Sequence, residues 1–169
     1  ATPIPRTMMM SHYGDMDVSK ITEKPSARKK ITTLSKPEKK INELWNFLTK
    51  QIAEKNQIFW VCPLIEESKF LDFSSAKKKF DLINNKFPNK VGLIHGSLGK
   101  EEKEKVLKRF LEKKISILVS TTVIEVGIDF PNANVIIIEN ANKFGLAQLH
   151  QLRGRVGRGN RQATCILLF

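Results

Sequence analysis

The sequence is poor in acidic side chains, in cysteine and in long apolar runs, and each shortage excludes a class of protein. Only 17 Asp and Glu oppose 29 Lys and Arg, so the net charge of +12 indicates a polyanionic partner, unless it reflects a lysine-rich composition alone. Cys62 and Cys165 lie inside apolar runs without metal-ligand spacing, which favours reduced thiols in a cytoplasmic protein. No apolar run approaches the roughly 20 residues of a membrane span, and no signal peptide is visible. We therefore expect no membrane contact.

A glycine-rich phosphate-binding loop is also missing from these residues. No GxxxxGK[ST] motif occurs, because GSLGK at 96–100 is too short, and no Asp-Glu pair closes an apolar strand where it could hold Mg²⁺. The chain is thus expected to donate side chains to a nucleotide without being able to cradle one. The chain thus has residues for one side of a nucleotide-binding site and lacks the phosphate-binding loop of the other side.

Arginine is scarce except in one stretch. The chain has 22 Lys and 7 Arg, and four of the arginines fall within nine residues: Arg153, Arg155, Arg158 and Arg161. A guanidinium group binds phosphate or carboxylate through two hydrogen bonds, which lysine cannot do. Gly154, Gly157 and Gly159 remove side-chain bulk, so that backbone and guanidinium groups can approach a ligand. The stretch lies between an apolar helix and an apolar strand, which favours a phosphate site; a solvated basic turn is the alternative.

Strand-like and helix-like segments alternate from residue 31 onward. Strands are predicted at 31–34, 58–65, 91–94, 115–119, 135–138 and 164–169, and helices at 37–55, 74–87, 100–112 and 146–152. This order predicts an α/β fold of three layers, in which helices cover both faces of a parallel sheet.

The helices show apolar positions at helical spacing. The residues expected to face the core are Ile41, Leu44, Trp45, Leu48, Ile52, Ala76, Phe80, Ile83, Phe87, Val106, Leu107, Phe110 and Leu111. The lysines at 77–79 are expected on the solvent-facing side of their helix.

Polar residues follow three of the predicted strands. They are His95-Gly96-Ser97, Ser120-Thr121-Thr122 and Glu139-Asn140. The carboxyl ends of parallel strands meet at the sheet edge where α/β proteins bind ligands, and small polar groups there suit phosphate oxygens. Each cluster singly also fits an ordinary helix N-cap.

Residues 1–28 do not resemble the start of an independent domain. Pro3 and Pro5 fix an opening loop, the methionines at 8–10 have little to pack against, and a basic, proline-containing linker ends at about residue 30. We expect residues 1–28 to be the tail of a preceding domain with its linker, and 29–169 to be one domain. Ala1 is not Met, so the N-terminus is expected to be processed or cut.

Four segments carry a resemblance to known motifs: ATPIPRT, FWVCPLIEES, STTVIEVGIDFPNANVIIIENA and FGLAQLHQLRGRVGRG. They resemble, in that order, motifs III, IV, V and VI of superfamily 2 helicases, in which motifs IV to VI belong to the second RecA-like lobe. Together they resemble specifically the RecG family of branched-DNA helicases. The last two form a long and specific block. The transcription-repair coupling translocases share FGLAQLHQLRGRVGR, but YGDMDVS and VCPLIEES favour RecG. The resemblance covers nearly the whole chain and implies a RecA-like, P-loop-NTPase-like fold.

The resemblance also implies roles for individual residues. Arg155 and Arg158 would be arginine fingers for the γ-phosphate of ATP, and Gln151 would link that site to motif III. Gly127 and Asp129 would lie beside the ATP ribose. The DNA backbone would be contacted by His95, Gly96, Ser120 and Thr121. Thr2 and Arg6 would couple the nucleotide state to DNA. Mg²⁺ would be held by the N-terminal lobe of the same parent chain.

The function implied is the C-terminal motor lobe of a monomeric, cytoplasmic ATP-dependent helicase acting on forked or branched DNA in recombination and repair. Without the other lobe, residues 1–169 are expected to lack ATPase activity. A lobe of a coupling translocase is one alternative. A non-catalytic basic module that binds nucleic acid is the other.

Overall fold

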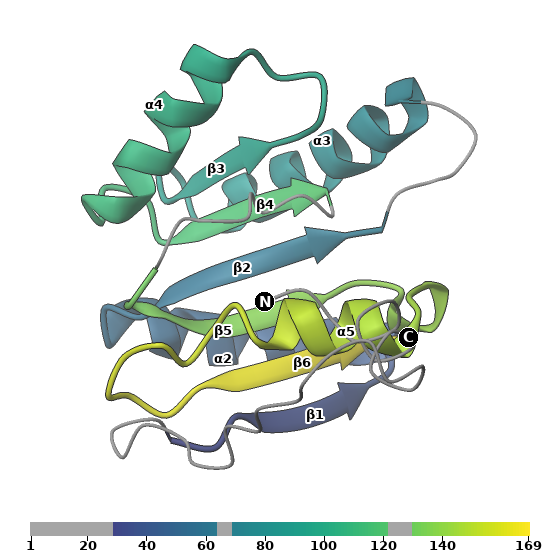
Figure 1. Ribbon diagram of the computed structural model, residues 1–169, viewed down its shortest axis with the longest axis vertical. Helices are drawn as coiled ribbons and strands as arrows, with labels where there is room; N and C mark the ends of the chain where they lie inside the picture. Colours follow the sequence, from purple (N-terminus) through teal and green to yellow (C-terminus); the bar gives the residue numbers. More distant parts are fainter. Residues whose placement is uncertain (1–28, 64–68, 122–129) are drawn as a thin grey trace, which may run out of the picture.

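The computed structural model describes residues 29–63, 69–121 and 130–169, and these form a six-stranded parallel sheet in the order β1-β6-β5-β2-β4-β3 (Figure 1). The strands are β1 (Thr32–Lys36), β2 (Gln57–Cys62), β3 (Val91–Ile94), β4 (Ile117–Thr121), β5 (Ala133–Ile138) and β6 (Thr164–Leu168). The helices are α2 (Ile41–Ala53), α3 (Lys69–Lys86), α4 (Lys100–Leu111) and α5 (Leu146–Arg153), with 3-10 turns η1 (Glu38–Lys40) and η2 (Ala141–Lys143).

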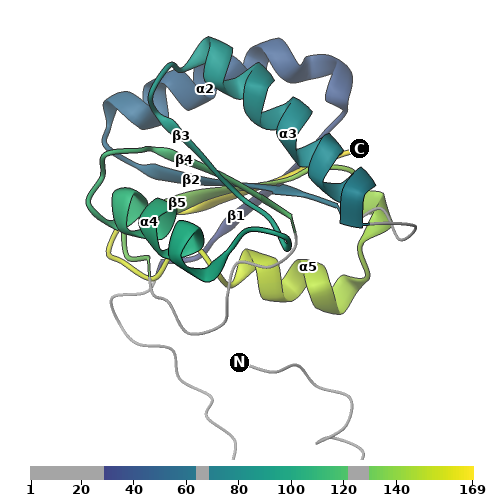
Figure 2. The same ribbon diagram turned by 90° about the horizontal axis from the view of Figure 1, so that it is seen from above.

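Helices cover both faces of the sheet and so form the predicted three layers. Helices α2 and α3 lie on one face, and α4 and α5 on the other (Figure 2). Each strand of the described sheet is parallel to its neighbours, so all six carboxyl ends lie at one edge and all six amino ends at the opposite edge. The predicted α/β class and parallel sheet are confirmed.

The central strand β2 supplies both halves of the core. Its residues are all buried, as expected for a strand between two helical layers. Because side chains alternate across a strand, Phe59 and Val61 pack under α4 and α5, while Ile58, Trp60 and Cys62 pack under α2 and α3. A continuous apolar run in the sequence is therefore divided between two cores.

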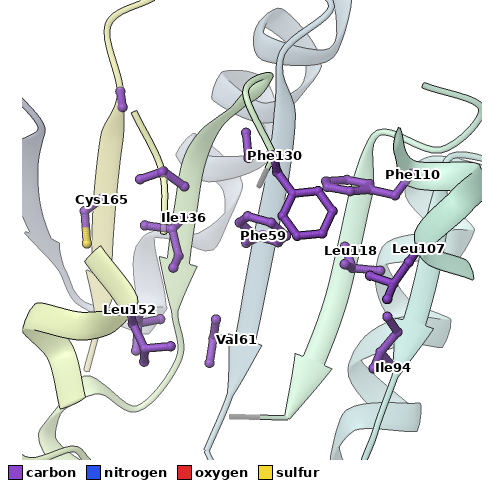
Figure 3. Packing of buried hydrophobic residues seen from close by; sticks show 14 of the residues in the cluster. Phe59, Val61, Ile94, Leu107, Phe110, Leu118, Phe130, Ile136, Leu152 and Cys165 are labelled. Atoms are coloured by element: carbon purple, nitrogen blue, oxygen red, sulfur yellow. The ribbon is translucent and has the colours of Figure 1, made fainter. Parts of the chain in front are cut away.

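Aromatic rings fill the centre of the core on the α4 side. Phe59 of β2 lies 5.4 Å from Phe110 of α4 and 5.3 Å from Phe130, measured between ring centroids (Figure 3). The edge-on arrangement of the Phe59 and Phe130 rings is a favourable aromatic geometry. These contacts fix the chain just before β5 against the sheet.

The predicted elements are all present among the described residues, with shifted ends. Helix α3 begins at Lys69, five residues earlier than predicted, and strand β4 begins at Ile117 because residues 112–116 complete the turn after α4. Ile115 is nonetheless fully buried, which explains why it looked like part of the strand. The predicted helix 37–55 divides into η1 and α2.

Two predictions about helix faces are wrong. Leu111 is expected in the core but is 45% exposed: its neighbour Phe110 faces the core, and the next residue of a helix points about 100° away from it. Lys79 was expected on the solvent-facing side of α3, but its ammonium group points inward and forms an ion pair with Glu139. The predicted boundary at residue 28 and the tail before it lie outside the described residues. None of the described helices is long and apolar enough to cross a membrane.

Candidate functional site

Polar groups gather at the carboxyl edge of the sheet, as the sequence predicts. Ile94, the last residue of β3, pairs with Ser120 of β4, so His95 and Gly96 follow β3 at the level of Thr121. Val61 of β2 pairs with Ser120 on one side and with Ile138 on the other. The structure therefore brings together the ends of four neighbouring strands.

The four residues at this edge differ in accessibility. Gly96 is exposed and His95 is partly exposed, whereas the Ser120 and Thr121 side chains are only 1% and 2% exposed. The Ser120 hydroxyl has no hydrogen-bond partner in the part of the chain that the structure describes. An external ligand at this edge would thus meet His95 and the Gly96 backbone before either hydroxyl group.

His95 is held in its neutral form. Burial of the imidazole lowers its pKa, and the positive charge of Lys103 on α4 lowers it further, against an opposing effect of Glu102. An unperturbed histidine has a pKa of about 6.5, so a lowered value leaves the ring uncharged at pH 7. A neutral imidazole donates one hydrogen bond and accepts another, and Lys103 supplies positive charge beside it.

Glu139 was predicted to suit a ligand at this edge, and the structure gives it an internal role instead. Its carboxylate is buried and accepts hydrogen bonds from Trp60 Nε1 at 3.1 Å and Cys62 Sγ at 3.5 Å. It also pairs with Lys79, whose ammonium group lies 3.7 Å from the Glu38 carboxylate and 5.6 Å from the centroid of the Trp60 ring. A carboxylate with its acceptor positions filled in this way is a structural link between β5, β2 and α3.

The arginine-rich stretch lies at the opposite edge of the sheet. Residues 154–163, the arginine loop, connect the end of α5 to the start of β6. Gly157 N–H donates to the carbonyl of Ala133, the first residue of β5, at 3.2 Å. A Cβ atom added to Gly159 would lie 2.5 Å from the Pro131 carbonyl oxygen, so only glycine permits this close approach. The predicted phosphate-binding arginines and the polar residues after β3 and β4 thus form two separate groups.

A buried valine separates the two arginines for which the sequence predicts a γ-phosphate contact. Val156 is fully buried in the core beneath α5 and anchors the loop. Arg155 continues the last turn of α5, its N–H donating to Leu152 O at 3.0 Å, and its side chain is partly exposed. Arg158 is exposed. The two arginines therefore flank a residue that is anchored in the core.

Gln151 lies on the exposed side of α5. With Phe144, Gln148 and Leu152 it lines a cavity of about 120 Å³. Leu146, the first residue of α5, is 86% exposed. The other predicted nucleotide and coupling residues (Gly127, Asp129, Thr2 and Arg6) lie outside the described residues.

Comparison with known proteins gives consistent matches. A family model described as the helicase conserved C-terminal domain matches residues 39–160. The chain is 51% identical over 99% of its length to the ATP-dependent DNA helicase RecG of Thermotoga maritima and 46% identical, again over 99%, to that of Bacillus subtilis. It covers 22% of the first of these proteins and 25% of the second, so it spans at most about a quarter of the curated relatives it matches.

Solved structures agree in fold. The structure of RecG bound to a three-way DNA junction matches 99% of this chain and 22% of that chain, with a TM-score of 0.79 and 48% identity. Domain 2 of the DEAD-box helicase Mss116p bound to an RNA duplex matches 82% of this chain and 53% of that chain, with a TM-score of 0.57 and 23% identity. The second match concerns the fold alone.

Proposed function

Because the chain belongs to the family of helicase conserved C-terminal domains, in its RecG branch, we propose that it is the C-terminal motor lobe of a longer ATP-dependent helicase that remodels branched DNA. The observation that supports this most is the arginine loop. It presents Arg155 and Arg158 on a buried anchor at one edge of the sheet, while the polar groups proposed to contact DNA lie at the other. Two ligands at two edges suit a motor that links ATP to DNA.

The proposed chemistry at the arginine loop is stabilisation of charge during ATP hydrolysis. When water attacks the γ-phosphate, negative charge spreads over its oxygens, and a guanidinium group placed against them lowers the barrier. Arg155 and Arg158 would enter the cleft from this lobe when it closes on nucleotide held by the other. Gly127 and Asp129 would contact the ribose, while Gln151 would connect the loop to Thr2 and Arg6.

The metal ion that accompanies ATP is assigned to the other lobe. No group of three His, Cys, Asp or Glu side chains among the described residues could hold one. No step of the proposal therefore runs through Mg²⁺ on these residues, and we propose that the metal is bound by the N-terminal lobe of the parent chain.

The proposed DNA contacts at the carboxyl edge would be made to the phosphate backbone. The accessible groups are the Gly96 N–H and the neutral His95 ring, with Lys103 adding positive charge nearby. Ser120 and Thr121 would contribute only if DNA binding exposed their side chains, since both are buried here. Contacts of this kind fix the position of DNA without reading its sequence.

The test is Arg158→Ala in the full-length parent helicase, with Arg109→Ala on the exposed end of α4 as a matched control. DNA-stimulated ATP hydrolysis should fall by roughly 10³-fold or more in the first variant, the scale for loss of an arginine finger. The dissociation constant for fork DNA should stay within about threefold, because the loop lies away from the proposed DNA edge.

Unchanged turnover in Arg158→Ala would disprove the arginine-finger assignment. It would favour a basic module that binds nucleic acid without using ATP. A loss of fork binding in step with turnover would instead make Arg158 a DNA contact. The Arg109→Ala control should keep both activities.

A further inference from the structure

Side chains at both ends of the arginine loop hold the segment through which the chain enters the domain. This entry segment is residues 30–32, just before and at the start of β1. Arg153 Nη2 donates to the Ile31 carbonyl at 3.3 Å. Gln162 Nε2 donates to the Lys30 carbonyl at 2.6 Å and to Thr32 Oγ1 at 3.1 Å. The two donors lie on either side of the proposed arginine fingers.

The middle of the loop rests on the same segment. Gly157 has a φ of +71°, a conformation that favours glycine. A Cβ atom added to it would lie 3.0 Å from Ala163 Cβ and 3.3 Å from Ile31 Cγ1. The backbone between Arg155 and Arg158 is thus in close contact with the Ile31 side chain, whose carbonyl Arg153 holds.

The Arg153 guanidinium acts through a hydrogen bond to one carbonyl group, because most of its surroundings are protein and not solvent. Its Nε is buried without a hydrogen-bond partner, and no ion pair of its guanidinium occurs among the residues that the structure describes. The group lies close enough to Cys165 of β6 for its charge to oppose the effect of burial on that thiol's pKa. Removing a guanidinium group from water costs free energy that one carbonyl acceptor offsets only in part. Packing alone therefore does not explain the position of Arg153.

Arg161 fixes the loop to a different element. Its Nη1 donates to the Glu54 carbonyl at the end of α2, at 2.8 Å, and to Asn56 Oδ1, at 2.9 Å. A positive charge at a helix C-terminus is favourable. This contact joins the loop to the body of the domain and is independent of the entry segment.

We propose that Arg153 and Gln162 are positioning residues that couple the entry segment to the arginine fingers. The inference rests on the function proposed above. If residues 1–28 are the tail of the other lobe with its linker, as proposed from the sequence, a pull on residues 30–32 when the lobes close would move the loop that carries Arg155 and Arg158. Turnover would then depend on the path of the linker as well as on the fingers.

The experiment uses the full-length parent helicase with the variants Arg153→Met, Arg153→Lys and Gln162→Ala, and with Arg109→Met as control. Arg153→Met should lower DNA-stimulated kcat by about tenfold, with the KM for ATP and the fork-DNA dissociation constant within about twofold, since only transition-state contacts are misplaced. Arg153→Lys should recover turnover to within about threefold of wild type, because one donor remains. Gln162→Ala should lower kcat about threefold.

Gln162 is exposed, so its variant tests the coupling even if Arg153→Met does not fold. Wild-type kcat in both Arg153→Met and Gln162→Ala would overturn the inference. So would a loss of activity that follows the fall in Tm and that Arg153→Lys does not reverse, because that pattern marks a purely structural residue.

The two proposals fail in different ways. If Arg158→Ala removes turnover while Arg153→Met and Gln162→Ala leave it intact, only the coupling is wrong. If Arg158→Ala has no effect, the proposed function itself is wrong.

Discussion

At the scale of single residues, Glu139 shows how a charged group at the carboxyl edge of the sheet stabilises the fold. Its carboxylate connects Trp60 and Cys62 of β2 with Lys79 of α3. Burial and the nearby negative charge of Glu139 raise the pKa of the Cys62 thiol well above its usual range, so that thiol stays protonated. The network joins two elements on either side of residues 64–68.

Glu139→Gln should lower the free energy of unfolding of the chain by about 2 kcal/mol. The amide can still accept from Trp60, but the Lys79 ammonium, 15% exposed, loses the carboxylate beside it and keeps only Glu38 at 3.7 Å. Urea denaturation measures the difference.

Glu112→Gln is the matched control for this change. Its carboxylate, 37% exposed, pairs with Lys114 at 2.7 Å on the surface, where solvent screens the ion pair, so this variant should lose much less stability. Equal losses in the two variants would show that burial of the Glu139 pair adds nothing.

The arginines show what sequence reasoning can predict about single residues. Their clustering indicates an anion site, because arginine is otherwise rare in this chain. The clustering does not show that Arg153 and Arg161 hold backbone carbonyls of Ile31 and Glu54, since those partners are far away in sequence. The predicted solvent-facing position of Lys79 is wrong for the same reason, because its partner Glu139 is far away in the sequence.

At the scale of secondary-structure elements, the contact between α4 and β3 depends on a glycine. A Cβ atom added to Gly92 of β3 would lie 2.5 Å from Ile115 Cδ1 and 2.9 Å from Val106 Cγ1. Both are the ends of side chains packed in or against the α4 core, so they can shift only by disturbing their neighbours.

Gly92→Ala should therefore lower the free energy of unfolding by about 1–3 kcal/mol, the usual effect of overpacking a core. Gly96→Ala, four residues later, is the control, because no atom lies within 4 Å of its added Cβ. Its effect should stay within about 0.5 kcal/mol. A smaller loss for Gly92→Ala than for Gly96→Ala in thermal or urea unfolding would refute this account of the packing.

The elements themselves are predictable from local pattern, and their ends are less so. Strand β2 is clear because five consecutive buried residues, 58–62, form an apolar run. The predicted start of α3 is five residues late, although Phe70 and Phe73 continue the helical spacing of Ala76 towards the N-terminus. Ile115 is assigned to the wrong element because a buried turn residue looks like a strand residue. The apolar pattern in the sequence reflects which residues are buried, and tertiary contacts decide which residues are buried. The ends of elements therefore cannot be predicted from local sequence alone.

At the scale of the whole molecule, charge and the missing phosphate loop predict how residues 1–169 should behave alone. The net charge of +12 favours DNA binding through phosphates, while no GxxxxGK[ST] motif is present to hold ATP. Fork-DNA affinity of the 169-residue chain, measured by fluorescence anisotropy, should weaken by tenfold or more between about 50 and 200 mM salt. Phosphate release should stay at background. DNA-stimulated hydrolysis by this chain alone would show that it holds a complete nucleotide site.

The pairing of β1 with β6 bears on how the domain is made. Strand β1 contains the earliest described strand residues, yet its only neighbour among the described strands is β6, the last of them along the chain, with Thr32 opposite Thr164. During synthesis β1 has no partner until residues 164–168 have left the ribosome. The strands β2 to β5 pair with one another without β6, whereas the contacts between the entry segment and the arginine loop require residues on both sides of the loop. A nascent chain of which only the residues before Thr164 have emerged would thus have β2 to β5 available for pairing, while β1 and the arginine loop still lack β6.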